Sequence, residues 1–189
     1  NVTAGNRSWS FTYITDDTAQ IVFSDGVSGN TSYRTTSPVL LPGDVGNWVY
    51  LTASMEPSTQ TGALYKNGLE VTGFLATSGS TTIVNSTSPF RISSLSNNTN
   101  FFDGGIDEVR ISNTIRGAGW IETEYNNQSD PSAFVPATPV ITPFLDAFTY
   151  QASFTIDSTK VFGASHSDFP VLFSGTYSWL ADTGNGGFL

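Results

Sequence analysis

Residues 101–115 read FFDGGIDEVRISNTI and place a carboxylate inside an alternating apolar pattern. Side chains on a β-strand alternate with a period of two, so a strand over residues 106–112 puts Asp107 on the same face as Val109 and Ile111. That apolar face predicts a core position. A carboxylate buried there without a partner costs several kcal/mol. We therefore expect Asp107 to be buried and to be held either by backbone N–H donors or by a hard cation such as calcium.

A metal site at this strand would use Asp107 together with Asp103 or with a backbone carbonyl from the loop at residues 97–102. Calcium is the candidate ion because the available ligands are oxygens, and the sequence has no cysteine and one histidine. The alternative is that Asp107 accepts backbone N–H bonds and binds nothing. The residues by themselves leave both possibilities open.

Two further motifs precede this stretch, GNWVYLTA at residues 46–53 and GALYKNG at residues 62–68. Together with GGIDEVRISN at 104–113 and the short amphipathic segment WIETEY at 120–125, and in this order, they resemble a laminin-G-like (concanavalin A-like) jelly roll of prokaryotic surface proteins. The resemblance covers roughly residues 7–134. It implies an all-β jelly-roll β-sandwich with one short helix, and a calcium ion that in related jelly rolls often lies near this strand.

Composition agrees with an extracellular all-β protein. Eighteen glycines, nine prolines and 13% aromatic residues suit short strands joined by turns, and only 12% of the residues are charged. The net charge of −9, with seven basic residues, argues against nucleic acid as a partner, because phosphate neutralisation needs clustered Lys and Arg. No apolar run approaches the ~20 residues of a membrane span, so we expect no membrane insertion. We expect a secreted, cell-surface or otherwise extracellular protein.

The alternation of apolar and polar residues predicts about seven strands. Asn67-Gly68 is the best two-residue hairpin turn, because both central positions must tolerate positive φ. The one helical candidate is residues 117–125. The predicted strands lie at residues 9–14, 19–24, 33–42, 48–54, 63–66 with 69–71, 90–94 and 106–112.

A proline-rich stretch marks a boundary in the second half of the chain. Residues 131–143 hold four prolines and no charge, which is typical of a semi-rigid extended linker. We therefore divide the chain into a laminin-G-like sandwich at 1–135, a linker at 136–143 and a further β-rich segment at 144–189. Within the last, FTIDSTKV and DFPVLF resemble the opening of an uncharacterised β-rich domain found beside such modules in prokaryotic surface proteins.

Both resemblances cover only part of their families. By these resemblances, we expect the jelly roll to lack the early strands that should precede Asn1 and the second domain to stop after its opening. An unpaired sheet exposes N–H and C=O groups along its edge. Three explanations stay open: the sequence is a fragment of a larger surface protein, a neighbouring copy supplies the missing strands, or the two parts complete one another.

Catalysis has little support in the sequence, and we expect no enzyme. Concanavalin A-like glucanases carry their paired carboxylates as Glu-x-Asp-x-x-Glu on one strand, and no such run occurs. Glu122 and Glu124 lie on the helical candidate, where residues two apart do not face each other. The single histidine, His166, lies in a loop sequence and is expected to be a solvent-exposed side chain.

Binding is therefore the expected role. Exposed aromatic faces form sugar-binding platforms, and Trp9, Tyr33, Trp120 and Trp179 are candidates for platforms or for core positions. The sequence favours a non-enzymatic adhesion or recognition module that binds glycans or surface proteins. The alternative is a structural subunit of an extracellular filament or surface layer, in which copies of the chain assemble by β-strand exchange.

Overall fold

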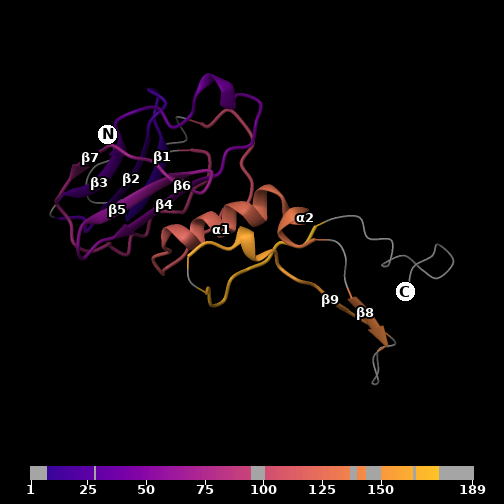
Figure 1. The fold of residues 1–189 in the computed structure, drawn as a ribbon. Coiled ribbons are helices and arrows are strands. Elements are labelled where there is room, and N and C mark those ends of the chain that lie inside the picture. The colour runs from indigo at the N-terminus through magenta and orange to yellow at the C-terminus, as the bar shows by residue number, and fades with distance from the viewer. Residues whose placement is uncertain are drawn as a thin grey trace. The chain divides into compact units, whose positions relative to one another are not determined.

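The structure is a computed structural model and forms two compact units (Figure 1). The first unit comprises Asn1–Lys66 and Glu70–Arg116, and the second comprises Asn67–Leu69 and Gly117–Leu189. The residues that the structure describes are 8–27, 29–94, 101–136, 140–143, 150–163 and 165–174.

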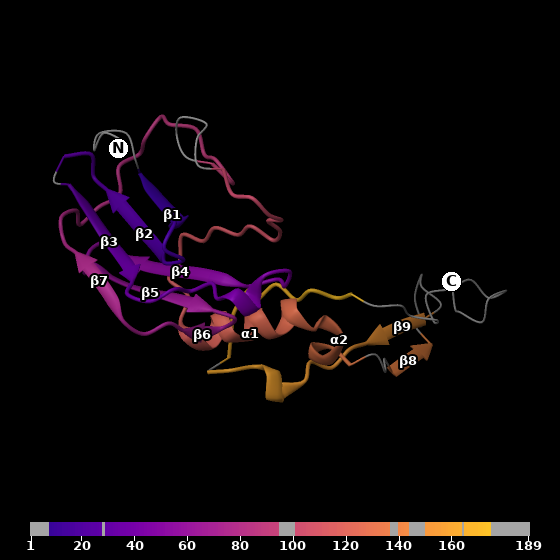
Figure 2. The same ribbon diagram turned by 90° about the horizontal axis from the view of Figure 1, so that it is seen from above.

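A four-stranded antiparallel sheet forms one layer of the first unit (Figure 2). Its strands follow the order β1-β2-β3-β7. The predicted hairpin at the start of the chain is confirmed, with Tyr13 opposite Ala19 and a turn in which Asp17 has a φ of 64°. The strands are β1 (Trp9–Tyr13), β2 (Ala19–Ser24), β3 (Asn30–Thr35) and β7 (Phe74–Thr77).

The second sheet has the order β4-β5-β6 and carries the predicted Asn67-Gly68 turn. The φ angles of 50° at Asn67 and 80° at Gly68 are the positive values that a tight two-residue hairpin requires. A short 3-10 helix, η1 (Pro42–Asp44), precedes this sheet. The strands are β4 (Leu51–Glu56), β5 (Thr61–Lys66) and β6 (Leu69–Glu70).

The core of the first unit lies between the apolar faces of the two sheets. Phe23 and Leu64 are almost completely buried, one from each sheet. Tyr33 of β3 packs edge-on against Phe74, and its hydroxyl donates to the Gln60 carbonyl at 2.8 Å in the turn before β5. A methyl group on Gly62 would lie 3.2 Å from the Tyr33 ring, so the sheets approach closely here. The all-β sandwich predicted from the sequence is confirmed.

A buried hydroxyl network joins β3, the connection after β7 and the turn between β4 and β5. The Thr31 hydroxyl donates to the Ser80 carbonyl at 2.8 Å and accepts from the Gly79 amide at 3.0 Å. The Gln60 side-chain amide donates to the same Ser80 carbonyl at 3.0 Å. Thr31 and Ser80 are both 0% exposed, so these bonds replace water at groups that folding has buried.

Two predicted strands are wrong. Residues 90–94 and 106–112 have irregular backbone, and Val109 and Ile111 are exposed, the latter by 62%. Asp107 is exposed as well, so its predicted burial is also wrong. Alternation describes which face a residue would take, but a strand forms only where a neighbouring strand accepts its hydrogen bonds. Within the described residues these two segments pair with no strand.

The second unit contains the predicted helix, which is longer than expected. Helix α1 (Ala118–Ser129) is followed directly by the short helix α2 (Pro131–Phe134), whose first turn is capped by Asp130 accepting from the Ala133 amide at 2.9 Å. Strands β8 (Val140–Pro143) and β9 (Tyr150–Ser153) form an antiparallel pair, and η2 (Ser158–Lys160) follows.

Strand β8 occupies part of the stretch that the sequence places in a proline-rich linker. Proline at the end of a strand fits this position, because its fixed φ is compatible with extended backbone. The sequence boundaries at residues 135 and 143 stay predictions about where independent domains meet. Among the described residues, no helix has the length and apolar character needed to cross a membrane.

We predict that Thr31→Val destabilises the protein by roughly 1–3 kcal/mol, because it removes one partner each from the half-buried Gly79 amide and the buried Ser80 carbonyl with little change in side-chain volume. Chemical denaturation followed by circular dichroism measures the change. Thr82→Val is the control, since Thr82 is exposed. Equal stabilities for the two variants would contradict a structural role for the network.

Candidate functional site

An exposed tryptophan stands at the start of the second sheet. Trp48 is 74% exposed and follows η1, three residues before β4 begins. The turn is fixed locally: the Asn47 amide donates to the Asp44 carbonyl at 3.0 Å, its side chain donates to the Gly43 carbonyl at 3.1 Å, and Gly46 has a φ of 82°. This turn places the indole outside the strand that the sequence predicts for it.

Two consecutive glycines let aromatic rings approach the main chain beside this tryptophan. A methyl group on Gly105 would lie 3.0 Å from Cη2 of Trp48, and one on Gly104 would lie 2.7 Å from Cε1 of Phe102. Larger residues at either position would displace these rings. We call Trp48, Phe102, Asp103, Gly104 and Gly105 the Trp48 surface.

Hydrogen bonds between Ser93 and Phe102 support this surface. The Phe102 amide donates to the Ser93 carbonyl at 2.9 Å, and the Ser93 hydroxyl donates to the Phe102 carbonyl at 3.3 Å. Ser93 has a φ of 67°. The segment that carries Asp103 is therefore fixed at Phe102, although it belongs to no strand.

Asp103 and Asp107, the two predicted metal ligands, are both exposed. The Asp107 carboxylate accepts the backbone N–H of Glu108 at 2.8 Å, which agrees with one of the two alternatives that the sequence offers for it. The Glu108 carboxylate pairs with Arg110 at 2.9 Å. Because Asp107 is exposed, the burial cost that led us to expect a compensating partner does not arise.

The described residues do not build a closed metal centre. No three His, Cys, Asp or Glu side chains among them gather closely enough to hold an ion. Calcium takes about six to eight oxygen ligands, and two carboxylates supply at most about four. Residues 97–100 of the loop proposed as a further ligand source lie outside the described residues. Calcium at Asp103 and Asp107 stays a prediction.

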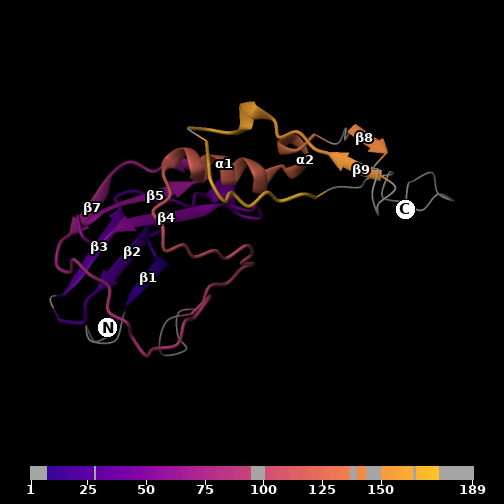
Figure 3. The same cartoon turned by 90° about the horizontal axis from the view of Figure 1, so that it is seen from below.

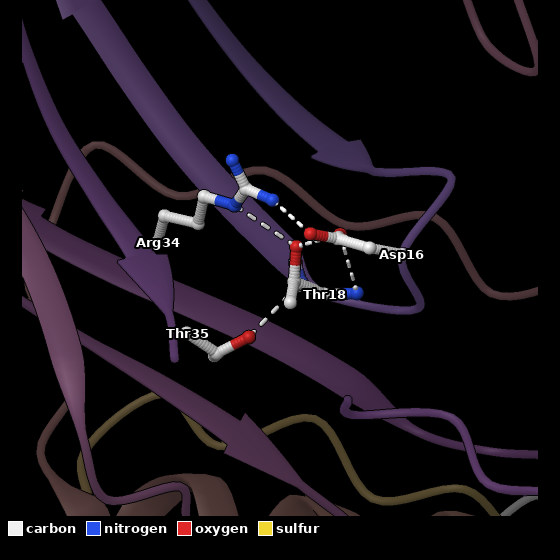
Figure 4. A network of polar contacts seen from close by, with 5 residues as sticks. Asp16, Thr18, Arg34 and Thr35 are labelled. Atoms are coloured by element: carbon white, nitrogen blue, oxygen red, sulfur yellow. Dashed lines mark hydrogen bonds and ion pairs between the residues drawn. The ribbon is translucent and has the colours of Figure 1, made fainter. Parts of the chain in front are cut away.

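A second polar cluster joins the β1–β2 turn to β3 (Figure 4). The Thr18 hydroxyl donates to the Asp16 carboxylate at 2.5 Å and accepts from Nε of Arg34 at 3.0 Å, while Nη2 of Arg34 pairs with the same carboxylate. The Ala19 amide donates to the Thr35 hydroxyl at 3.2 Å. These groups satisfy one another, so the cluster is better suited to holding the turn than to binding a ligand.

Hydrogen bonds at this turn shift the pKa values of Asp16 and Tyr13. The Thr18 hydroxyl has the largest effect in holding the pKa of Asp16 below its ordinary value of 3.8; desolvation opposes it, and the Thr18 amide and the charge of Arg34 lower the pKa further. At the same turn, the hydrogen bond from the Tyr13 hydroxyl to the Asp17 carboxylate raises the pKa of Tyr13 to about 12. The Asp16 carboxylate is therefore ionised at neutral pH, and the Tyr13 hydroxyl keeps its proton.

The aromatic platforms proposed from the sequence mostly take part in packing. Trp9 packs on Phe90 with 5.8 Å between ring centroids, and Tyr33 joins the two sheets. Trp120 packs on Phe169 at 5.2 Å, and Trp179 lies outside the described residues. Sequence reasoning missed Trp48 because its neighbours alternate like a strand; the preceding Gly46-Asn47 pair is the signal for a turn.

The residues considered for catalysis do not form a catalytic arrangement. Glu122 and Glu124 lie on α1 as expected. His166 was expected to be solvent-exposed but is half-buried, with its Nε2 3.0 Å from the Phe162 carbonyl and 3.2 Å from the Thr123 hydroxyl. Because a carbonyl only accepts, Nε2 carries a proton and donates to Phe162. His166 therefore serves a structural contact in the second unit.

Comparison with known proteins gives one match. A family model described as the concanavalin A-like lectin/glucanases superfamily matches residues 1–122. A search of curated proteins and a search of solved structures each gave no match. The matched range contains both sheets of the first unit and the whole Trp48 surface.

The lowered pKa of Asp16 predicts a pH-dependent contribution to stability. A carboxylate whose folded pKa lies below its unfolded value stabilises the fold above the unfolded pKa, and that contribution is lost as the pH falls through the folded pKa. We expect the melting temperature of Asp16→Asn to lie below that of wild type at about pH 6, and the difference to shrink as the pH falls through the folded pKa of Asp16, which lies below 3.8.

Thr18→Val provides a matched test of the cause, because it removes the hydroxyl that lowers the Asp16 pKa most. As the pH is lowered from about 6, its melting temperature should fall less than that of wild type. A gap between wild type and Asp16→Asn that persists at the acidic end would contradict the assignment.

Proposed function

The chain belongs to the concanavalin A-like lectin/glucanases superfamily as a laminin-G-like module that binds carbohydrates or proteins, and we propose that it recognises neutral glycans at the Trp48 surface. The observation that carries this proposal is the exposed indole of Trp48 lying against Gly105. Laminin-G-like and lectin-like folds are typically non-catalytic, and the proposed activity is recognition without chemical change.

The indole offers a flat apolar platform of the kind that the less polar face of a sugar ring covers. Its edge lies in the space that a side chain at Gly105 would fill, and we propose that this position partly orients the ring before a ligand arrives. Pre-orientation reduces the side-chain entropy lost on binding, which is about 0.5–1.5 kcal/mol for a mobile side chain. Gly105 thus contributes to recognition because its lack of a side chain leaves room for the Trp48 ring.

Asp103 supplies the polar part of the surface. It precedes Gly104, is exposed, and its carboxylate accepts hydrogen bonds from hydroxyl groups. The net charge of −9 favours an uncharged ligand, because a sialylated or sulfated glycan would approach against like charge. A neutral, hydroxyl-rich oligosaccharide therefore fits the surface best.

Adhesion outside the cell is the setting that we propose for this binding. The low charge content and the absence of cysteine are compatible with a secreted or cell-surface protein of this family. A calcium ion at Asp103 and Asp107 would take its remaining oxygen ligands from outside these two side chains. Glycan binding measured with and without a chelator therefore tests the calcium prediction as well.

Assembly by strand exchange is a second candidate function, and the position of β1 at the edge of its sheet, with no further strand beside it among the described residues, favours it. The amide of Ser24 donates to the Ser8 carbonyl at 3.0 Å and that of Ile14 donates to the Thr18 carbonyl at 2.8 Å. Successive residue pairs of an antiparallel ladder alternate between hydrogen-bonded and non-hydrogen-bonded. The main-chain N–H and C=O groups of Trp9, Phe11 and Tyr13 therefore point away from β2. An added strand from another copy would pair with them.

The experiment that tests the glycan proposal is a neutral oligosaccharide array followed by calorimetry on the best ligand. We expect Trp48→Ala to weaken binding about tenfold or more, because loss of an aromatic contact costs about 0.5–1.5 kcal/mol beyond its buried area. Gly105→Val should weaken binding as well, by displacing the indole without removing it. Val45→Ala, an exposed apolar residue of the preceding turn, is the control and should bind like wild type.

Unchanged affinity in Trp48→Ala would move the site elsewhere on the sandwich. If wild type binds no neutral oligosaccharide, the glycan proposal is wrong. Light scattering then tests the second candidate function. Strand exchange predicts that wild type forms particles larger than one chain. It also predicts that these particles are lost in Phe11→Pro, because proline removes an outward-facing N–H from β1.

A further inference from the structure

The sequence repeats the triplet Asn-x-Ser/Thr, in which x is not proline and to which transferases attach N-linked oligosaccharides. We propose that Asn85 is such an acceptor site. Ser and Thr are so frequent in this chain that the triplet alone decides little, and accessibility in the folded chain must select among its copies. The triplets begin at Asn1, Asn6, Asn30, Asn85, Asn97 and Asn127.

A usable acceptor needs two groups that are free in the folded chain. The amide nitrogen of the asparagine forms the new bond, and the hydroxyl two residues later is the second part of the recognised pattern. Asn1, Asn6 and Asn97 lie outside the described residues. The remaining three triplets differ in which of the two groups folding leaves accessible.

Folding hides the asparagine of the triplet that begins at Asn127. This residue is 0% exposed, its Nδ2 donates to the Leu172 carbonyl at 3.0 Å, and its Oδ1 accepts from the Leu172 amide at 2.6 Å. An oligosaccharide on Nδ2 would break this pairing and would have no space inside the second unit. Asn127 is therefore excluded as an acceptor in the folded chain.

The triplet that begins at Asn30 has the opposite defect, because folding hides its hydroxyl. Asn30 is exposed at the start of β3, but Ser32 is only 6% exposed, and its hydroxyl is hydrogen-bonded to that of Thr77 at 2.8 Å. Ser32 also pairs with Thr77 in the ladder between β3 and β7. A transferase could reach the Ser32 hydroxyl only if these strands separated.

Both groups are accessible in the triplet that begins at Asn85. Asn85 and Thr87 are exposed and have irregular backbone, and no hydrogen bond between described residues involves either side chain. Figure 3 shows the stretch after β7 as a plain magenta trace without a strand arrow. An exposed loop is the structural setting that the motif requires. Of the three described triplets, the one at Asn85 is thus the only one that meets both conditions.

Main-chain hydrogen bonds on both sides of Asn85 hold its loop in place within the first unit. The Val84 amide donates to the Ser24 carbonyl at 2.9 Å, and the Ser86 amide donates to the Ser8 hydroxyl oxygen at 3.1 Å. These bonds use the backbone of the two neighbours and leave the Asn85 side chain free. An attached oligosaccharide therefore replaces no contact of the fold.

The transfer forms one bond and breaks one. Nδ2 of Asn85 bonds to the anomeric carbon of an oligosaccharide that is linked through phosphate to a carrier lipid, a donor available at the membrane that an exported chain crosses. The bond between the anomeric carbon and the phosphate oxygen breaks, and the phosphorylated lipid leaves with its electron pair. Nδ2 loses one proton to a basic group of the transferase, so no oxidant or reductant is required.

The attached oligosaccharide would shield apolar side chains of the same loop. Ile83 is 48% exposed and Phe90 is 59% exposed. Exposed apolar groups favour association of chains, and a bulky hydrated sugar opposes it. This inference rests on the extracellular setting proposed above, and it is independent of the Trp48 surface.

Tandem mass spectrometry of proteolytic peptides tests the proposal on full-length protein purified from the organism that makes it. The method localises an added sugar mass to one asparagine, and we expect it at Asn85 and not at Asn127. Thr87→Ala should lose the sugar at Asn85, because it removes the hydroxyl of the motif. Ser129→Ala, the same change in the triplet of Asn127, is the matched control and should keep the sugar at Asn85.

An unmodified Asn85 in the wild-type protein would overturn the proposal, so the result does not depend on the folding of a variant. The location of the protein separates two causes of that outcome. Unmodified protein outside the cell contradicts this inference alone, whereas unmodified protein inside the cell contradicts the extracellular setting as well. Sugar on Asn127 of the folded protein would show that burial does not select the site.

Discussion

The sandwich depends on partners for the polar groups that it buries around Thr31. The hydroxyl of this residue joins β3 to the connection after β7, and Gln60 joins the same connection to the turn between β4 and β5. The main-chain carbonyl of Gln60 also accepts from Tyr33, whose ring lies in the core. Since an unpaired buried polar group costs about 1–3 kcal/mol, these few bonds fix how the two sheets meet.

The sequence predicted those parts of the fold that are encoded within a few neighbouring residues. The alternation in WSFTY and AQIVFS gives β1 and β2, and Asn67-Gly68 gives the turn between β5 and β6, because side-chain alternation and positive φ are local properties. The motif order also predicted the family, which the match over residues 1–122 confirms. Fold class follows from such patterns once several of them occur together.

The parts that could not be predicted depend on partners distant in the sequence. Ile106 to Ile111 alternate as a strand would, but alternation does not provide the neighbouring strand that would bury Asp107. Trp48 resembles a core residue until the turn at Gly46 and Asn47 is seen to place it outside β4. The role of Asn127 was equally hidden, since its two bonds reach forty-five residues along the chain.

The two units differ in how they satisfy main-chain hydrogen-bonding groups outside the sheet ladders. In the second unit, the Asn127 amide completes the hydrogen bonds of Leu172 without a strand. In the first, β1 ends its sheet with the sequence WSFTY, which contains no charge and no proline. Sheet edges that must stay unpaired are usually protected by charged residues or by proline. The absence of both kinds of residue from β1 agrees with the proposed addition of a strand at this edge.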